Sequence, residues 1–207
     1  MIQIALIAVI GGALASLLLA IRGGDRALEV LSKGVASVGF VVLGMMRWTA
    51  GDTVGTWIVA GLALCALGDI LLLWDRSFGA GLGSFLLGHV AYIVAFANAL
   101  PMNRWPLLML APVVLTSVGA GSWLWPHLGR RRLSVGAYIV AISIMVWGGL
   151  AVVGAGAMGW TAASGAVLFY LSDLAVARHR FVQPEFVNRG IGLPLYYAGQ
   201  VLIALSI

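Results

Sequence analysis

Long apolar runs separated by short polar breaks follow one another along the whole chain. A helix needs about 17 to 25 apolar residues to cross a bilayer core, and short breaks favour antiparallel packing of neighbouring helices. The pattern predicts an all-α integral membrane protein, an eight-transmembrane-helix bundle that forms a single polytopic domain over residues 1–207. The predicted spans are 2–21, 29–46, 53–74, 81–100, 106–126, 134–153, 159–178 and 190–207.

Composition excludes a soluble catalytic domain. The chain is 62% hydrophobic and only 9% charged, whereas about 25% of the residues of a soluble domain are charged. Its 28 glycines suit helices that pack closely in lipid, where small residues let backbones approach. The first apolar run has no basic leader and no small-residue cleavage site, so we expect it to be a retained helix.

Basic residues lie almost entirely on one side of the predicted bundle. The breaks after the first, third, fifth and seventh runs, with the adjoining helix ends, hold ten of the twelve lysines and arginines. The positive-inside rule makes this side cytoplasmic and both termini non-cytoplasmic, and we expect the location to be a bacterial inner membrane. The net charge of +5 is explained by this bias, so no nucleic-acid partner is expected. The ten residues are Arg22, Arg26, Lys33, Arg76, Arg130, Arg131, Arg132, Arg178, Arg180 and Arg189.

Two aspartates lie inside apolar runs at matching depths. Asp69 and Asp173 each precede the cytoplasmic end of their run by about five residues, which at roughly 1.5 Å per residue puts both carboxyl groups about 7 to 8 Å inside. Ionisable groups at membrane depth cost about 2.5 to 3.5 kcal/mol on insertion scales and mark functional sites. Asp69 and Asp173 are therefore the candidate catalytic pair, although a purely structural pairing of Asp69 with Lys33 is an alternative.

The two halves of the chain echo one another. A shift of 104 residues superposes Asp69 on Asp173, and it also matches Gly88 with Gly192 and Tyr92 with Tyr196. Because four crossings return a chain to its starting side, a duplicated four-helix unit keeps its orientation. The pattern suggests two parallel four-helix repeats, with paired sites near their interface.

Further polar side chains lie at depths compatible with the aspartates. On the fourth run His89 and Tyr92 are three residues apart and share a face, while Lys33 opens the second run. The alternative, purely structural roles are interfacial anchoring for the tyrosines, interhelical hydrogen bonding for His89 and Gln200, and snorkelling of the Lys33 ammonium group to lipid headgroups. Cys65 is expected to be a packing residue because the chain has no second cysteine. The candidate substrate-binding or supporting residues are Lys33, His89, Tyr92, Tyr196, Tyr197 and Gln200.

Four blocks of sequence resemble the YhhN family of eight-span membrane proteins, whose animal members are lysoplasmalogenases. They are "GDILLL", "FGAGLGSFLLGHVAYIVAF", "FYLSDLAVARHRF" and "LPLYYAGQVLIA". The resemblance implies that Asp69 and Asp173 are the catalytic pair, and Lys33, His89, Tyr197 and Gln200 also match family positions. Family members often have proline after the lysine of the second span, where this chain has Gly34.

The resemblance implies hydrolysis of the vinyl ether bond of a lysoplasmalogen, a lysophospholipid within the membrane, to a fatty aldehyde and a glycerophospho-headgroup compound. The reaction needs one protonated and one ionised carboxyl group, as in glycoside hydrolysis, and no metal or organic cofactor is expected. The sequence does not decide which aspartate is the acid; we favour Asp173, which lies among tyrosines. A proton-coupled transporter, a lipid-binding membrane protein and, ranked lower, an intramembrane aspartyl protease are the alternatives.

Overall fold

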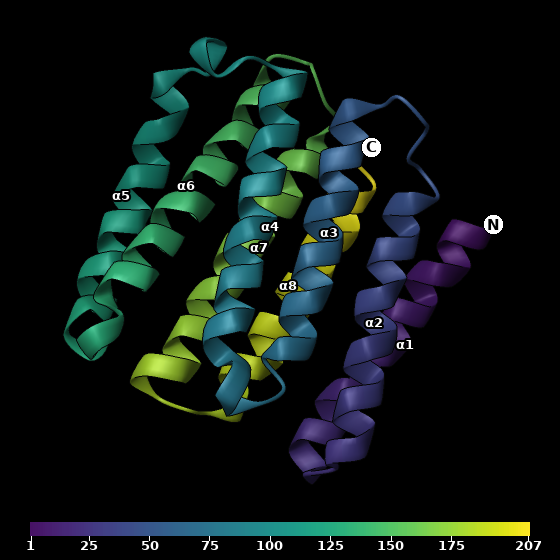
Figure 1. Ribbon diagram of the computed structural model, residues 1–207, viewed down its shortest axis with the longest axis vertical. Coiled ribbons are helices and arrows are strands. Elements are labelled where there is room, and N and C mark those ends of the chain that lie inside the picture. The colour runs from purple at the N-terminus through teal and green to yellow at the C-terminus, as the bar shows by residue number, and fades with distance from the viewer.

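The computed structural model describes residues 1–207 as a bundle of long helices without strands (Figure 1). Short 3₁₀ turns or loops connect most of the helices, and a π-helical turn at Arg178–Val182 extends α7. The eight helices are α1 (Ile2–Gly23), α2 (Arg26–Met45), α3 (Thr53–Leu71), α4 (Phe78–Ala99), α5 (Leu107–Leu124), α6 (Arg132–Gly154), α7 (Trp160–Ala177) and α8 (Phe186–Ala204).

The second helix begins earlier than the hydrophobic pattern predicts. The Asp25 side chain accepts a hydrogen bond of 3.0 Å from the backbone N–H of Leu28, which caps the helix and starts it at Arg26 rather than at residue 29. Glu29 and Lys33 consequently lie inside regular helix, one turn apart on one face.

The third and fourth helices also differ from their predicted ends. α3 stops at Leu71 instead of continuing to residue 74, and α4 starts at Phe78 instead of residue 81. Ser77 turns the chain there, because its hydroxyl donates to the carbonyl of Leu71 at 2.6 Å. The carbonyl groups at the end of α3 are thus satisfied by a neighbouring side chain.

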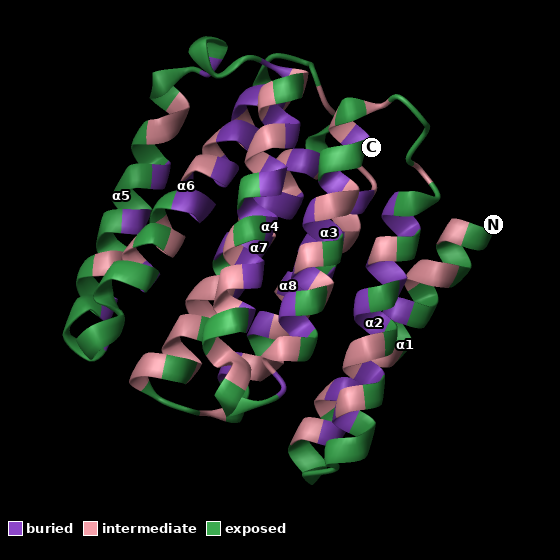
Figure 2. Ribbon diagram, viewed as in Figure 1, coloured by how far each residue is buried: buried purple, intermediate pink, exposed green.

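Packing joins the helices into one bundle with α5 at one edge. Neighbours in sequence pack as the pairs α1–α2, α3–α4, α5–α6 and α7–α8, while α4 contacts α6 and α2 contacts α8 across the bundle. One hydrophobic core includes buried residues from all eight helices. Figure 2 shows that α5 carries mostly exposed residues and that the buried residues concentrate on the central helices, while α1 has only three buried residues.

Seven of the eight helices are long and apolar enough to cross a membrane, which makes the chain an integral membrane protein. The exception is α8, whose 19 residues include Arg189, Asn188 and Gln200. Its polar residues fit its position, because α8 packs against α1, α2, α3 and α7 and runs behind α3 over the height of the bundle (Figure 1). The eighth crossing stays a prediction.

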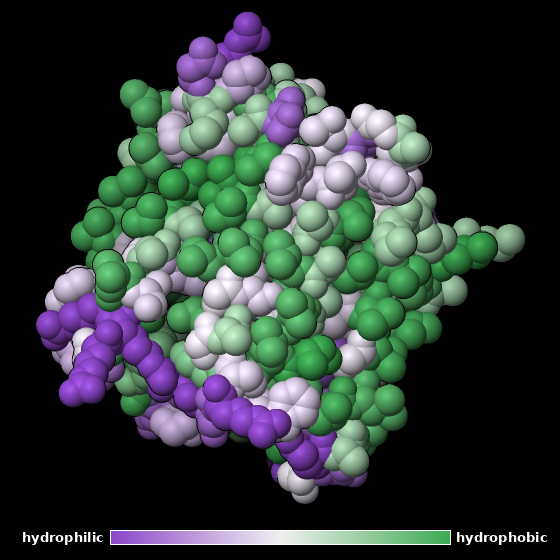
Figure 3. Space-filling view, viewed as in Figure 1, coloured by the Kyte–Doolittle hydropathy of each residue, from purple (hydrophilic) through white to green (hydrophobic).

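The two ends of the bundle differ in polarity. We call the end with the α1–α2, α3–α4, α5–α6 and α7–α8 connections the basic face, and the end with both termini the terminal face. Figure 3 shows hydrophobic residues over most of the visible side and a concentration of hydrophilic ones at the basic face, at the bottom of the view. This distribution is that of a protein surrounded by acyl chains.

Candidate active site

A cavity of about 410 Å³ opens at the basic face and contains both candidate aspartates in its wall. Residues from α2 to α8 contribute to it, so it lies at the centre of the bundle and not in a groove between two helices. Its volume falls in the range of small-molecule sites. The charged residues and tyrosines that line it are Arg26, Lys33, Asp69, Asp75, Tyr138, Tyr170, Asp173, Arg180, Arg189 and Tyr196.

Asp69, on α3, is surrounded by donors and by one cation. Its Oδ2 accepts hydrogen bonds of 2.7 Å from the Ser37 hydroxyl and 2.7 Å from the Tyr196 hydroxyl, and the Lys33 Nζ lies 3.2 Å from Oδ1. The Asp69 side chain is only 3% exposed. Tyr197 extends the network, because its hydroxyl lies 3.3 Å from Ser37 Oγ. The Asp69 carboxyl group therefore faces one ammonium group and two hydroxyl donors.

Asp173, on α7, has different neighbours and no cation. Its Oδ2 accepts a hydrogen bond of 2.8 Å from the Tyr138 hydroxyl of α6, and the Nε2 of His89 on α4 lies 3.3 Å from the same oxygen. The Asp173 side chain is 18% exposed and lines the cavity. This carboxyl group is therefore accessible to a molecule in the cavity. Like Asp69 it accepts from a tyrosine, but its second neighbour is an imidazole and not an ammonium group.

The orientation of His89 restricts where a proton can lie. Its Nδ1 is 2.8 Å from the carbonyl oxygen of Phe85, and since a carbonyl only accepts, Nδ1 must carry a hydrogen. In the neutral imidazole, Nε2 is then an acceptor directed at Asp173. Two acceptors cannot form a hydrogen bond, so the close approach of Nε2 to Asp173 Oδ2 requires one proton shared by the pair.

The other predicted site residues lie deeper in the bundle. Tyr92 and Gln200 are fully buried and bond to each other, with Tyr92 donating to Gln200 Oε1 at 2.7 Å. Neither they nor His89 nor Tyr197 line the cavity, whereas Lys33, Tyr196 and both aspartates do. Tyr92 and Gln200 join α4 to α8 farther from the basic face than the aspartates. His89 contacts Asp173, and Tyr197 contacts Ser37, which donates to Asp69.

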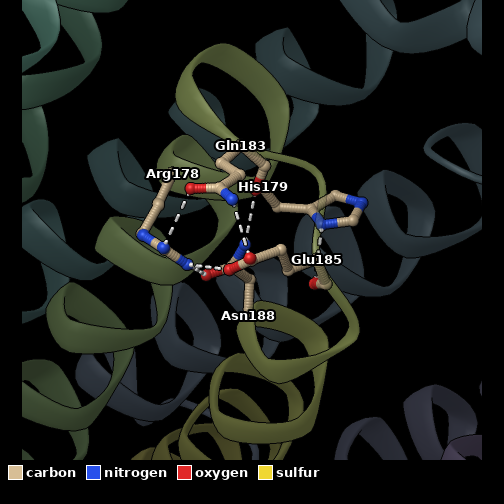
Figure 4. Close-up of polar contacts among 5 residues, drawn as sticks. All are labelled: Arg178, His179, Gln183, Glu185 and Asn188. Atoms are coloured by element: carbon tan, nitrogen blue, oxygen red, sulfur yellow. Dashed lines mark hydrogen bonds and ion pairs between the residues drawn. The ribbon is translucent and has the colours of Figure 1, made fainter.

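A tight polar network fixes the connection between α7 and α8 (Figure 4). Arg178 bonds Glu185 at 3.0 Å and also Asn188, and Gln183 donates to Glu185 at 2.7 Å. His179 closes the turn through the carbonyl of Glu185. The network holds both sides of the loop in place. Arg180 and Arg189, which line the cavity, lie on these two sides.

Three residues at the cavity mouth, Arg26, Glu29 and Arg189, were not predicted to belong to the site. Arg26 donates to Glu29 at 2.8 Å and Arg189 donates to it at 3.0 Å. A usable signal existed, because Glu29, Lys33 and Ser37 are spaced by four and form one face of α2. Arg180 also lines the cavity and pairs with Asp75 at 2.8 Å.

Known proteins resemble the chain in sequence. The YhhN family model matches residues 28–207. The lysoplasmalogenase TMEM86B of Sus scrofa is 38% identical over 148 residues, 71% of this chain and 62% of that protein. The lysoplasmalogenase TMEM86A of Bos taurus is 38% identical over 160 residues, 73% of this chain and 65% of that protein. A lysoplasmalogenase of Mycobacterium tuberculosis is 36% identical over 158 residues, 71% of this chain and 58% of that protein.

The chain thus spans less than two thirds of the length of these relatives. No solved structure matches it. The sequence blocks that carried the resemblance, "GDILLL" through "LPLYYAGQVLIA", all lie within the matched region. Since the family model covers most of the chain, and the relatives are more than a third identical to it, the chain belongs to the YhhN family.

Proposed function

We propose that the chain is a lysoplasmalogenase, which hydrolyses the vinyl ether bond of a lysophospholipid to a fatty aldehyde and a glycerophospho-headgroup compound. The observation that carries the proposal is the pair of carboxyl groups in one cavity with opposite surroundings. Asp69 is bonded by a cation and two hydroxyl donors, whereas Asp173 shares a proton with His89. The named relatives are lysoplasmalogenases, which supports the same reaction.

Asp173 is the acid of the reaction and Asp69 the carboxylate. Cleavage of a vinyl ether begins with protonation of its β-carbon, which leaves an oxocarbenium ion at the α-carbon and the ether oxygen. The proton that His89 and Asp173 share supplies this step. Asp69, held ionised by Lys33, stabilises the cation across the cavity, as paired carboxyl groups do in glycosidases.

Water then completes the reaction with all protons accounted for. Water adds to the oxocarbenium carbon and gives one proton to Asp69, so that a hemiacetal forms. The hemiacetal collapses when its hydroxyl returns a proton to Asp173 and Asp69 protonates the departing glycerol oxygen. The products are one aldehyde and one alcohol, and both aspartates regain their starting protonation states. A weak base is sufficient at Asp69 because water bonded to a cationic carbon is strongly acidic.

The positions of the two aspartates fit the order of atoms in the substrate. Asp69 bonds to residues of α2 and α8, beside the arginines of the mouth, while Asp173 bonds to α4 and α6. On the side of α5 and α6, the apolar residues Ala120, Leu124, Val135, Ile139 and Ile142 line the cavity. A lysolipid with its tail against these residues would have its β-carbon toward Asp173, because that carbon is on the tail side of the ether oxygen.

The same proposal includes eight membrane crossings, with the basic face cytoplasmic and both termini on the other side. The support is the ten-to-two distribution of basic residues and the length of α8 along the bundle (Figure 1). The cavity then opens to the cytoplasmic leaflet, so that a lysolipid would enter with its headgroup in the aqueous mouth. A transporter would instead hold its ionisable groups near the midplane.

The test is a panel of lysolipids given to the purified protein. Vinyl-ether, ester and saturated-ether lysolipids of equal chain length are incubated separately, and the released aldehyde is measured by mass spectrometry. We expect aldehyde from the vinyl ether alone, and none from a double variant, Asp69→Asn with Asp173→Asn. Ester cleavage, or uptake of lipid into vesicles without product, would refute the proposed function.

A further inference from the structure

At the mouth of the cavity, two arginines donate hydrogen bonds to one buried carboxylate. Arg26 of α2 and Arg189 of α8 donate to different oxygens of Glu29, at 2.8 and 3.0 Å. The Glu29 side chain is only 10% exposed, so it is fixed, and Arg26 is anchored further by the carbonyl of Leu73. One carboxylate thus holds two guanidinium groups at the cavity wall with one positive charge in excess.

Neighbouring charges do not cancel this excess. Lys33 forms an ion pair with Asp69, and on the opposite wall Arg180 forms an ion pair with Asp75. The remaining acid of the cavity, Asp173, shares a proton with His89 and so adds no net charge to the pair. The uncompensated positive charge of the cavity therefore belongs to Arg26 and Arg189.

Both guanidinium groups keep donors free for a ligand. The Arg26 side chain is 50% exposed and the Arg189 side chain 38%, and both line the cavity. A guanidinium presents five N–H donors in a fixed fork that matches phosphate oxygens, and these contacts use only some of them. A phosphodiester, with a single negative charge, matches the excess charge of the cluster.

We propose that the Arg26–Glu29–Arg189 cluster is the site that binds the phosphodiester of the lysolipid headgroup. This inference rests on the proposed function, since it orients that substrate: phosphate at α2 and α8, the reacting bond between the aspartates, and the tail toward α6. Glu29 positions the two arginines and does not contact the ligand. The α7–α8 network of Figure 4 holds the start of α8, and with it Arg189.

The experiment compares two substrates that differ only in the phosphate. Aldehyde release is measured from 1-alkenyl-glycerophosphoethanolamine and from 1-alkenylglycerol, which has no phosphate, and the ratio of their kcat/KM values is determined. We expect Arg189→Gln and Arg26→Gln each to lower this ratio about tenfold or more, through KM, because a hydrogen bond to a charged group is lost. Arg189→Lys, which keeps the charge but not the fork, should recover part of the ratio.

The matched control is Arg130→Gln, which removes an exposed arginine of the basic face outside the cavity and should leave the ratio unchanged. An unchanged ratio in both cluster variants, or an equal change in Arg130→Gln, would overturn the phosphate site while the hydrolase activity stands. Loss of folding is monitored by size-exclusion chromatography, and Arg26→Gln serves if Arg189→Gln does not fold.

A binding measurement separates this inference from the proposed function. If the wild-type protein releases no aldehyde, calorimetric titration with a non-cleavable saturated-ether lysophosphatidylethanolamine still tests the cluster. Tighter binding than the matching alkylglycerol, abolished by Arg189→Gln, supports the site, and equal binding of the two overturns it. Inorganic phosphate is the third titrant: binding at least as strong as that of the lysolipid would contradict a site for the lipid phosphodiester.

Discussion

The two halves of the bundle place an aspartate at the same position and surround it differently. Asp69 on α3 is bonded by side chains from α2 and α8, and Asp173 on α7 by side chains from α6 and α4. If α2 is paired with α6, α3 with α7 and α4 with α8, the helices around Asp69 correspond to the helices around Asp173. The packing follows the same rule, since α3–α4 corresponds to α7–α8 and α2–α8 to α6–α4. Only the chemistry of the neighbours differs.

Close helix contacts support the same correspondence. Gly61 of α3 and Gly165 of α7 are 104 residues apart, the shift that superposes the aspartates. A Cβ at Gly61 would lie 2.4 Å from the Tyr92 ring, and one at Gly165 would lie 2.8 Å from the carbonyl oxygen of Gly199. Each pair of helices therefore packs through a glycine at the same place, as a duplicated unit predicts.

A similar arrangement of helices surrounds both members of the candidate acid–base pair. Each half places one carboxyl group in the wall of the cavity, and the two groups differ in the side chains beside them. At Asp69 the neighbour is Lys33, a cation; at Asp173 it is an imidazole whose Nε2 accepts. Environments that separate the protonation of two carboxyl groups are how enzymes assign an acid and a base.

The largest expected effect comes from removing either carboxyl group. Asp69→Asn and Asp173→Asn should each lower kcat for vinyl-ether cleavage by about 10³-fold or more, since an acid or base contributes up to about 10⁴-fold. The double variant should be no worse than the worse single variant, because the two groups act as a unit. Initial rates of aldehyde release measure this.

A control for these variants lies on the opposite side of the bundle. Asp52 caps α3 at the terminal face, where its side chain accepts from the backbone N–H of Gly55. Asn caps helices equally well, so Asp52→Asn should retain full activity. If the two catalytic substitutions multiplied in the double variant, the aspartates would act in separate steps and the comparison of half-sites would lose its basis.

The next effect is on stability and concerns the cation that only one half has. Lys33→Met leaves Asp69 buried without its cation, which should cost about 3 kcal/mol of unfolding free energy. The double variant Lys33→Met with Asp69→Asn should regain most of this loss, while adding Asp173→Asn instead should not. Denaturation in detergent measures the unfolding free energies of the wild type, of each single variant and of the two double variants, and Arg22→Met, at the end of α1, is the control. Additive losses would mean that Lys33 and Asp69 are not coupled.

Removal of His89 tests the other half. His89→Gln should lower kcat about hundredfold, at the low end of the effect of a general acid. Tyr138, the other side chain that donates to Asp173, stays in place, so the variant removes the imidazole alone. Initial rates of aldehyde release measure the effect. Full activity in His89→Gln would contradict a proton donor that includes His89.

The fold could be predicted from the sequence almost completely, because lipid imposes simple rules. Apolar run length sets the number of helices, and every observed helix overlaps its predicted run. The ends differ where a local polar contact decides, as at Asp25, which starts α2 at Arg26. For α8 the hydropathy signal is weak because its polar residues face other helices, so composition alone does not establish that crossing.

The members of the candidate site could be predicted better than the contacts between them. Helix rise predicts equal depth for Asp69 and Asp173, and both line one cavity. The pairing of Asp69 with Lys33, which the sequence offered as an alternative, is present, whereas the contact of His89 with Asp173 depends on helix rotation and on packing between elements far apart in the chain. The same holds for Arg189 and Glu29, which are 160 residues apart. Periodicity along one helix carries no information on such contacts.

The smallest expected effect is on the unfolding free energy, and it compares the hydrogen bonds that two tyrosines donate to Asp69 and Asp173. Tyr196 donates to Asp69 at 2.7 Å and Tyr138 donates to Asp173 at 2.8 Å. A hydrogen bond to an ionised group contributes about 1.5 to 3 kcal/mol and a neutral one about 1 kcal/mol. Tyr196→Phe should therefore lower the unfolding free energy by about 2 kcal/mol and Tyr138→Phe by about 1 kcal/mol, measured by denaturation in detergent near neutral pH. Equal losses would place the shared proton on His89 and not on Asp173, and the assignment of Asp173 itself as the acid would then fail.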